Sequence, residues 1–153
     1  MKYIGEYTTR GQMTDSATKM VRIPLFQGDY SIGYRVKNFV VSVQDRDDTA
    51  THILHCMLAT EKVEPDGLKD WDWSRPTQIA WNRTTEDANQ TSMTSPYYLE
   101  IDPENLIVED LFVGIYIYGG SGTEVCNYMI TLEKYELEPF QGLGAMVNNQ
   151  SQG

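Results

Sequence analysis

The chain has 153 residues, of which 41% are hydrophobic and 22% charged, a composition typical of one globular domain. Its net charge of −10 is unevenly distributed, because residues 1–40 carry six Lys and Arg against three Asp and Glu. An acidic body opposes phosphate binding, so we expect no direct contact with nucleic acid. No apolar run approaches the length of about 20 residues that a membrane helix needs, so we expect no membrane insertion. The N-terminus lacks the apolar core of a secretory signal, which indicates synthesis in the cytoplasm.

The first half of the chain contains several extended runs. Residues 1–16 combine a short strand, Tyr3–Thr8, with a polar stretch, and predict an N-terminal arm whose strand lies at a sheet edge. Residues 17–25 and 30–44 are the next two predicted strands. Residues 51–60 are apolar on both faces, which favours a central strand.

The middle of the chain is less regular. Residues 61–76 contain Pro, Gly and Trp without a strand period, and residues 83–94 are polar and predict an exposed loop. Residues 78–82 and 97–101 are short strand candidates on either side of that loop.

The longest periodic stretch runs from Ile107 to Leu137. Residues 111–118 alternate between two faces, a period of two that predicts a strand. The Gly-rich segment Gly119–Gly122 follows, and a second extended run continues to Leu137. The two runs predict a long antiparallel hairpin, which needs further strands to cover its apolar face.

These elements predict an all-β fold in which two antiparallel sheets pack as a β-sandwich. A single jelly roll is the favoured topology, because it accommodates the long mid-chain loops. An immunoglobulin-like sandwich is the alternative, since Trp71, Trp73 and Trp81 lie between Cys56 and Cys126. We expect both cysteines to be buried free thiols.

The sandwich is expected to span residues 17–138, between extended terminal arms. After Leu137 the small and amide side chains of residues 139–153 show no helix or strand period. We therefore expect a C-terminal tail that is either disordered or ordered on a partner.

The sequence contains no motif for a known reaction. His52 and His55 are the only histidines, and on a strand they face opposite sides, which favours structural roles over catalysis or a metal pair. The acidic turn Asp45–Asp48 lacks the complete pattern of a calcium loop. We therefore expect no catalytic residues, no metal and no cofactor, and a protein that is not an enzyme.

Aromatic residues mark a possible ligand surface around the long irregular segment. Trp71, Trp73 and Trp81 are candidates for stacking against a glycan, as in sugar-binding β-sandwiches. The alternative is that these rings fasten the segment to the core or to a neighbouring subunit.

A second set of residues is expected to form an interface between subunits. Phe112, Tyr116 and Tyr118 alternate with the inner face of their strand, and an exposed aromatic stripe is typical of an interface. Gln141 and Met146 in the predicted tail are the other candidates.

The segments Asp102–Leu111, Asn127–Leu137 and Gln141–Gln152 resemble the C-terminal part of small coat-like virion proteins of environmental tailless viruses. The resemblance covers residues about 102–152 and includes no catalytic motif. It implies a single jelly roll that assembles into a shell, although the acidic body departs from coats that package genomes through a basic arm. The favoured function is therefore a capsid subunit located in the virion, with copies of itself and other virion proteins as partners. The alternative is a carbohydrate-binding module, such as a spike, fibre or lectin-like domain, with a glycan as its partner.

Overall fold

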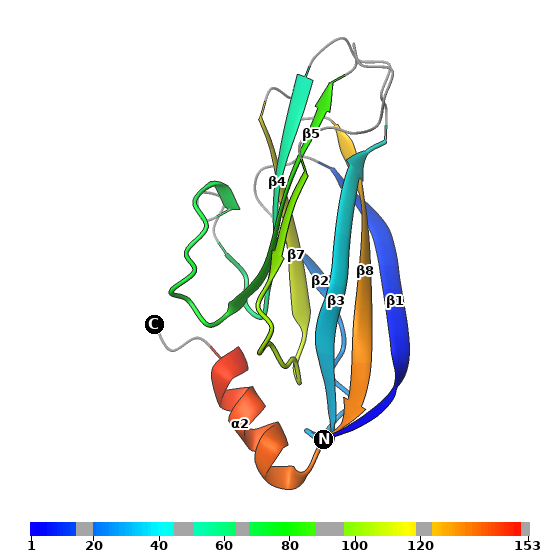
Figure 1. The fold of residues 1–153 in the computed structure, drawn as a ribbon, viewed down its shortest axis with the longest axis vertical. Helices are drawn as coiled ribbons and strands as arrows, with labels where there is room; N and C mark the ends of the chain where they lie inside the picture. The colour runs from blue at the N-terminus through cyan, green and yellow to red at the C-terminus, as the bar shows by residue number, and fades with distance from the viewer. Residues whose placement is uncertain (15–19, 45–50, 64–67, 88–96, 119–123, 151–153) are drawn as a thin grey trace.

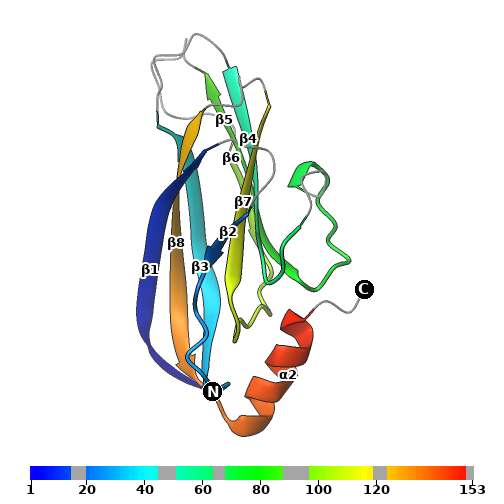
Figure 2. The ribbon, with the colours of Figure 1, turned by 180° about the vertical axis from the view of Figure 1, so that it is seen from behind.

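A computed structural model describes residues 1–14, 20–44, 51–63, 68–87, 97–118 and 124–150. Within these ranges the chain folds into strands that form two sheets packed face to face, followed by a helix at one end (Figures 1 and 2). The elements are β1 (Lys2–Thr14), β2 (Val21–Ile23), β3 (Ile32–Val43), β4 (Thr51–Ala59), β5 (Gln78–Asp87), β6 (Tyr97–Ile101), β7 (Leu111–Tyr118), β8 (Val125–Glu136) and α2 (Pro139–Asn149).

The two sheets confirm the predicted all-β sandwich. One sheet has the order β1-β8-β3 and is called here the β8 sheet, and the other has the order β2-β7-β4-β5-β6 and is called the β7 sheet. All pairings within both sheets are antiparallel. The apolar inner faces of the sheets bury one continuous core, in which the side chains of Phe39, Leu54, Leu58, Ile130 and Leu132 are fully enclosed.

Strands from the two ends of the chain pair with each other in a nested order. β1 pairs with β8, β2 with β7, and β4 with β5. β6 pairs with β5 at the edge of the β7 sheet. Just after β6, Ile107 forms a bridge to Tyr34 of β3 through two backbone hydrogen bonds of 2.8 Å, which ties the two sheets together at this point.

The predicted hairpin of β7 with β8 is wrong, although both strands exist. β7 lies between β2 and β4 in one sheet, whereas β8 lies between β1 and β3 in the other. The alternation within β7 is confirmed, because Leu111, Val113, Ile115 and Ile117 are all buried. A period of two shows which face of a strand is buried, but not which strands lie at its edges. Gly119–Gly122, the predicted turn, lies outside the described residues.

Most of the predicted N-terminal arm is a full strand of the sandwich. β1 pairs with β8 from Lys2, opposite Glu136, to Thr14, opposite Val125. The expected edge position is correct, because β1 is the last strand of the β8 sheet. Gly5 has a φ of 146° at a bulge in this pairing, a conformation that strongly favours glycine.

The C-terminal segment is a helix, and the prediction of an extended tail is wrong for residues 139–149. Pro139 occupies the first turn of α2, and Glu138 and Gln141 cap the N-terminus reciprocally. One side of the helix packs against the sandwich through Gly142, Ala145 and Asn149. The described part of the chain contains no helix with the length and apolar character needed to cross a membrane.

The segment between β4 and β5 covers the outer face of the β7 sheet. Leu68 from this segment packs with Met20, Met57, Ala59 and Trp81 in a second apolar cluster. The cluster gives part of the β7 sheet apolar cover on both faces, so the outer face of β7 is not a free surface.

Candidate functional site

An apolar face of α2 points away from the sandwich. Phe140 is 88% exposed, Leu143 51% and Val147 50%. These positions are spaced by three and four residues, so their side chains share one side of the helix. We call these three residues the α2 face.

The opposite side of α2 holds the helix in a fixed orientation. The Asn149 side-chain oxygen accepts a hydrogen bond of 2.8 Å from the Val108 N–H, and its amide donates one of 2.8 Å to the Leu106 carbonyl. The Thr60 hydroxyl donates to the Asn149 backbone carbonyl at 3.0 Å. Gly142 lies directly against the Tyr30 backbone. These contacts fix which side of the helix faces outward.

The N-terminal part of β1 exposes further apolar side chains near the start of α2. The exposed residues are Met1, Tyr3, Ile4 and Tyr7. Lys2 pairs with Glu136, which precedes α2 by a short turn, and Figures 1 and 2 both place the N-terminus beside the beginning of the helix. One end of the sandwich therefore carries exposed apolar groups from both ends of the chain.

The predicted aromatic stripe on β7 is largely covered by the same chain. Phe112 and Tyr116 are half-buried in the cluster around Leu68, and the Lys69 ammonium lies 4.7 Å from the centre of the Tyr116 ring. Tyr118 is exposed. The Leu68 segment has no strand period, so its position on this face could not be read from the sequence.

The two interface candidates in α2 do not belong to the α2 face. Gln141 is exposed, but its side-chain oxygen accepts the Glu138 N–H as part of the helix cap. Met146 packs partly buried between the helix and the sandwich. Sequence reasoning missed Phe140, Leu143 and Val147. Their spacing of three and four residues is compatible with a helix, but Gly142 and Gly144 between them have weak helix propensity, so the sequence did not predict one.

The tryptophans of the predicted ligand surface occupy different environments. Trp71 is half-buried and stacks on His55, with ring centres 4.0 Å apart and planes within 8°. Trp73 is 61% exposed and lies 5.4 Å from Trp81 between ring centres. Trp81 is buried and donates its indole N–H to Gln78 at 3.2 Å. Trp73 is therefore the tryptophan best placed to meet a ligand.

An open groove of about 430 Å³ lies beside the exposed Trp73 ring. We call it the Trp73 groove. Its polar lining comes from Ser74, Arg75 and Gln78, and from Glu100 and Asp102 of a later segment. The aromatic ring can stack against a sugar ring. The neighbouring carboxylate and amide oxygens can accept hydrogen bonds from the hydroxyl groups of that sugar.

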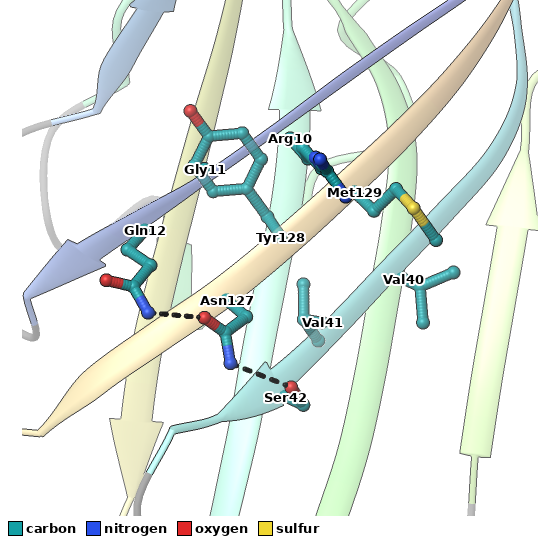
Figure 3. A pocket seen from close by; sticks show the side chains of 9 residues that line it. All are labelled: Arg10, Gly11, Gln12, Val40, Val41, Ser42, Asn127, Tyr128 and Met129. Carbon is teal, nitrogen blue, oxygen red and sulfur yellow. Dashed lines mark hydrogen bonds between the residues drawn. The ribbon is translucent and has the colours of Figure 1, made fainter.

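A second depression, of about 520 Å³, lies on the β8 sheet (Figure 3). A line of amide and hydroxyl groups crosses its three strands: Gln12 donates to Asn127 at 2.8 Å, and Asn127 donates to Ser42 at 3.4 Å. Met129 and Arg10 lie together on one side of this line. The depression is a shallow surface feature across β1, β8 and β3.

Both histidines lie in β4, where His52 is buried and His55 is half-buried. His52 is buried with its Nε2 3.7 Å from a Glu124 carboxylate oxygen, and His55 Nδ1 lies 2.7 Å from the Leu68 carbonyl oxygen. The described residues contain no group of three or more His, Cys, Asp or Glu side chains arranged to hold a metal. The calcium candidate Asp45–Asp48 lies outside them.

Known proteins give little further information. No family model matches the chain, and no curated protein matches it. A chain from the structure of Turnip Yellow Mosaic Virus at 100 K is similar at 8% identity and a TM-score of 0.35, over 87% of this chain and 94% of that chain. A TM-score this low does not establish a common fold.

Proposed function

We propose that the protein is a structural subunit that assembles with copies of itself, and more specifically a capsid subunit of a virion. The outward α2 face is the observation that carries this proposal. A helix that is firmly docked on one side presents Phe140, Leu143 and Val147 to solvent on the other. Fully burying an exposed side chain of this kind gains up to about 1.5–3 kcal/mol. A group of exposed apolar side chains is typical of a contact surface.

The strand order is in keeping with this role. Nested pairing of β1 with β8, β2 with β7 and β4 with β5 is the order of a single jelly roll, with β6 moved to the free edge of β5. Jelly rolls occur in viral capsid proteins and in lectins, and the fold alone does not distinguish the two. The resemblance of residues 102–152 to coat-like proteins favours the capsid. The negative charge of the chain favours contacts with other proteins over direct contacts with a genome.

Size-exclusion chromatography with light scattering, followed by negative-stain electron microscopy, tests the proposal. The wild-type chain is expected to form large particles at high concentration. Phe140→Asp should abolish them while leaving thermal stability nearly unchanged, because Phe140 packs little within its own chain. Asn148→Asp is the matched control, since it adds the same charge to an exposed position outside the α2 face. A wild-type protein that stays monomeric over a wide range of concentration and salt would overturn the proposal.

A glycan-binding module is the second candidate, and the Trp73 groove favours it. The exposed ring of Trp73 borders Glu100 and Asp102, which belong to a segment distant in sequence. Trp71 does not line this groove, and Trp81 forms part of its wall, so the candidate now rests mainly on Trp73.

A glycan array tests this second candidate. Trp73→Ala should remove any binding without lowering thermal stability, because the ring is mostly exposed. Tyr98→Ala is the control, since Tyr98 is an exposed aromatic residue outside the groove. An array without a signal above background would remove this candidate and leave the assembly proposal unaffected.

A further inference from the structure

The outer edge of β1 is open for pairing. β1 is the end strand of the β8 sheet, and in the described part of the chain its only strand partner is β8. An edge strand of this length presents a row of unpaired N–H and C=O groups that another strand can bind. No proline interrupts β1, and Glu6, Thr8, Arg10 and Gln12 are exposed along it.

The register with β8 places these four residues on the outer surface of the β8 sheet. Gln12 lies opposite Asn127, whose side chain it contacts on that surface, and Arg10, Thr8 and Glu6 follow at intervals of two residues. The four side chains therefore form one row along the open edge.

The charges in this row are complementary to themselves. β1 runs from Lys2 to Thr14, so its central residue is Thr8. A second copy that pairs antiparallel along the whole strand places Thr8 opposite Thr8. Glu6 then lies opposite Arg10 of the second copy, and the two-fold symmetry forms this pair twice.

Other registers lose this match. In a two-fold pairing, the residues opposite each other must lie on the same face of the sheet. The partner strand can therefore shift only by two residues at a time. The neighbouring registers put Thr8 opposite Glu6 or opposite Arg10, and the next ones put Glu6 opposite Glu6 or Arg10 opposite Arg10. Charge complementarity thus selects the register centred on Thr8, in which residues 6–10 of the two copies pair without reaching the bulge at Gly5.

We propose that two copies of the chain pair through β1, antiparallel and centred on Thr8, so that their β8 sheets form one continuous sheet. This inference rests on the proposed self-assembly, because it identifies one of the contacts between subunits. The backbone hydrogen bonds supply most of the affinity. The Glu6–Arg10 pairs add little to the affinity, because exposed ion pairs contribute little energy. Their role is to select the register, since other registers lose these pairs or place like charges opposite one another. Within its own chain Glu6 binds Lys37 through Oε1.

Cross-linking at the two-fold axis tests the register. Thr8→Cys should give a dimer with a short bismaleimide, because the two substituted residues face each other. Gln12→Cys is the control: in this register its two copies lie about eight residues of strand apart, roughly 26 Å, beyond the reach of the reagent. The native thiols are buried and do not compete. Equal cross-linking of both variants, or none at Thr8→Cys, would overturn the inference.

Charge reversal tests the ion pairs independently. Glu6→Arg alone and Arg10→Glu alone should each weaken dimer formation, since each places like charges opposite one another. An equimolar mixture of the two variants should recover it. In the mixed dimer the new arginine at position 6 faces the new glutamate at position 10, and Arg10 of the first variant faces Glu6 of the second, so both pairs again join opposite charges. Dimers of the single variants that are as stable as wild type would count against the pairing.

The outcomes separate this inference from the proposed function. Large particles without cross-linking at Thr8→Cys would overturn the β1 pairing and leave the assembly proposal standing. A cross-linked dimer that forms no larger particle would support the β1 pairing and overturn the capsid proposal.

Discussion

Two glycines of α2 have opposite surroundings, which makes them a matched pair for mutation. A Cβ at Gly142 would lie 2.2 Å from the Tyr30 backbone oxygen, whereas nothing lies within 4 Å of one at Gly144. Alanine is favoured over glycine in a helix by roughly 1 kcal/mol. We expect Gly144→Ala to raise the free energy of unfolding by up to about that amount.

Gly142→Ala should lower the free energy of unfolding instead, because α2 must move away from a backbone carbonyl that cannot yield. Equilibrium denaturation of both variants measures the two effects. A gain in stability for both would mean that α2 does not dock on Tyr30.

His55 should make stability depend on pH. Burial lowers the pKa of His55 below its ordinary value of 6.5, and the positive charge of Arg83 acts in the same direction. The folded state therefore holds the neutral ring, while the unfolded chain takes up a proton near pH 6.5. The stabilising contribution is complete above that pH and is lost as the pH falls below it.

The titration of His55 can be followed directly by NMR, where its midpoint should lie below 6.5. The free energy of unfolding is measured by denaturation at about pH 7.5 and at about pH 5.5. Its decrease between these two pH values should be smaller for His55→Gln than for wild type. A midpoint above 6.5 would contradict this account.

At the scale of elements, α2 belongs to the folded unit. The helix covers Val108 and Leu137, and its Asn149 supplies the hydrogen-bond partner of the Val108 N–H. Deleting residues 139–153 would expose these apolar side chains and leave that N–H without its partner. We expect a loss of several kcal/mol, since an unsatisfied buried group alone costs about 1–3 kcal/mol.

Thermal and chemical denaturation of the truncated chain test this expectation. Phe140→Asp is the comparison, because it changes the exposed face of the helix and keeps the docked one. If the truncated chain were as stable as wild type, α2 would be an independent appendage, as expected for a tail.

The segment between β4 and β5 shows how a loop changes the role of a sheet face. Leu68 packs against Gly114 of β7, and Trp71 lies on His55 of β4. Because of this cover, Phe112 and Tyr116, which the sequence suggested as interface residues, pack partly buried against their own chain. The exposed apolar surface is thereby left to β1, α2 and single residues such as Tyr118.

At the scale of the whole molecule, the two cysteines can show whether the two sheets stay packed together. Cys56 comes from the β7 sheet and Cys126 from the β8 sheet, and both side chains are fully buried. Burial raises the pKa of the Cys56 thiol, and the neighbouring Cys126 adds to the effect. Both thiols should therefore be unreactive while the sheets are packed together.

We expect a maleimide to label both cysteines together, at a rate that follows global unfolding. Mass spectrometry after labelling in increasing denaturant measures this, with the fully unfolded chain as the reference. Rapid labelling of one thiol in native buffer would show that the sheets separate locally.

The sequence alone determined the fold class and the buried faces of the strands. The alternation of Leu111, Val113, Ile115 and Ile117 predicts their burial, because a strand turns successive side chains to opposite faces whatever lies beside it. The burial of Cys56 and Cys126 follows from the apolar runs around them. These properties depend on near neighbours in the chain.

Tertiary structure alone decided the pairing of strands, the helix and the grouping of the candidate sites. β7 and β8 are adjacent in sequence and yet lie in different sheets, since pairing depends on which distant strands share an edge. α2 contains two glycines and becomes a helix where docking on Tyr30 and Val108 outweighs their weak propensity. The α2 face and the edge of β1 are exposed only because other parts of the chain leave them uncovered, and that is a property of the assembled molecule.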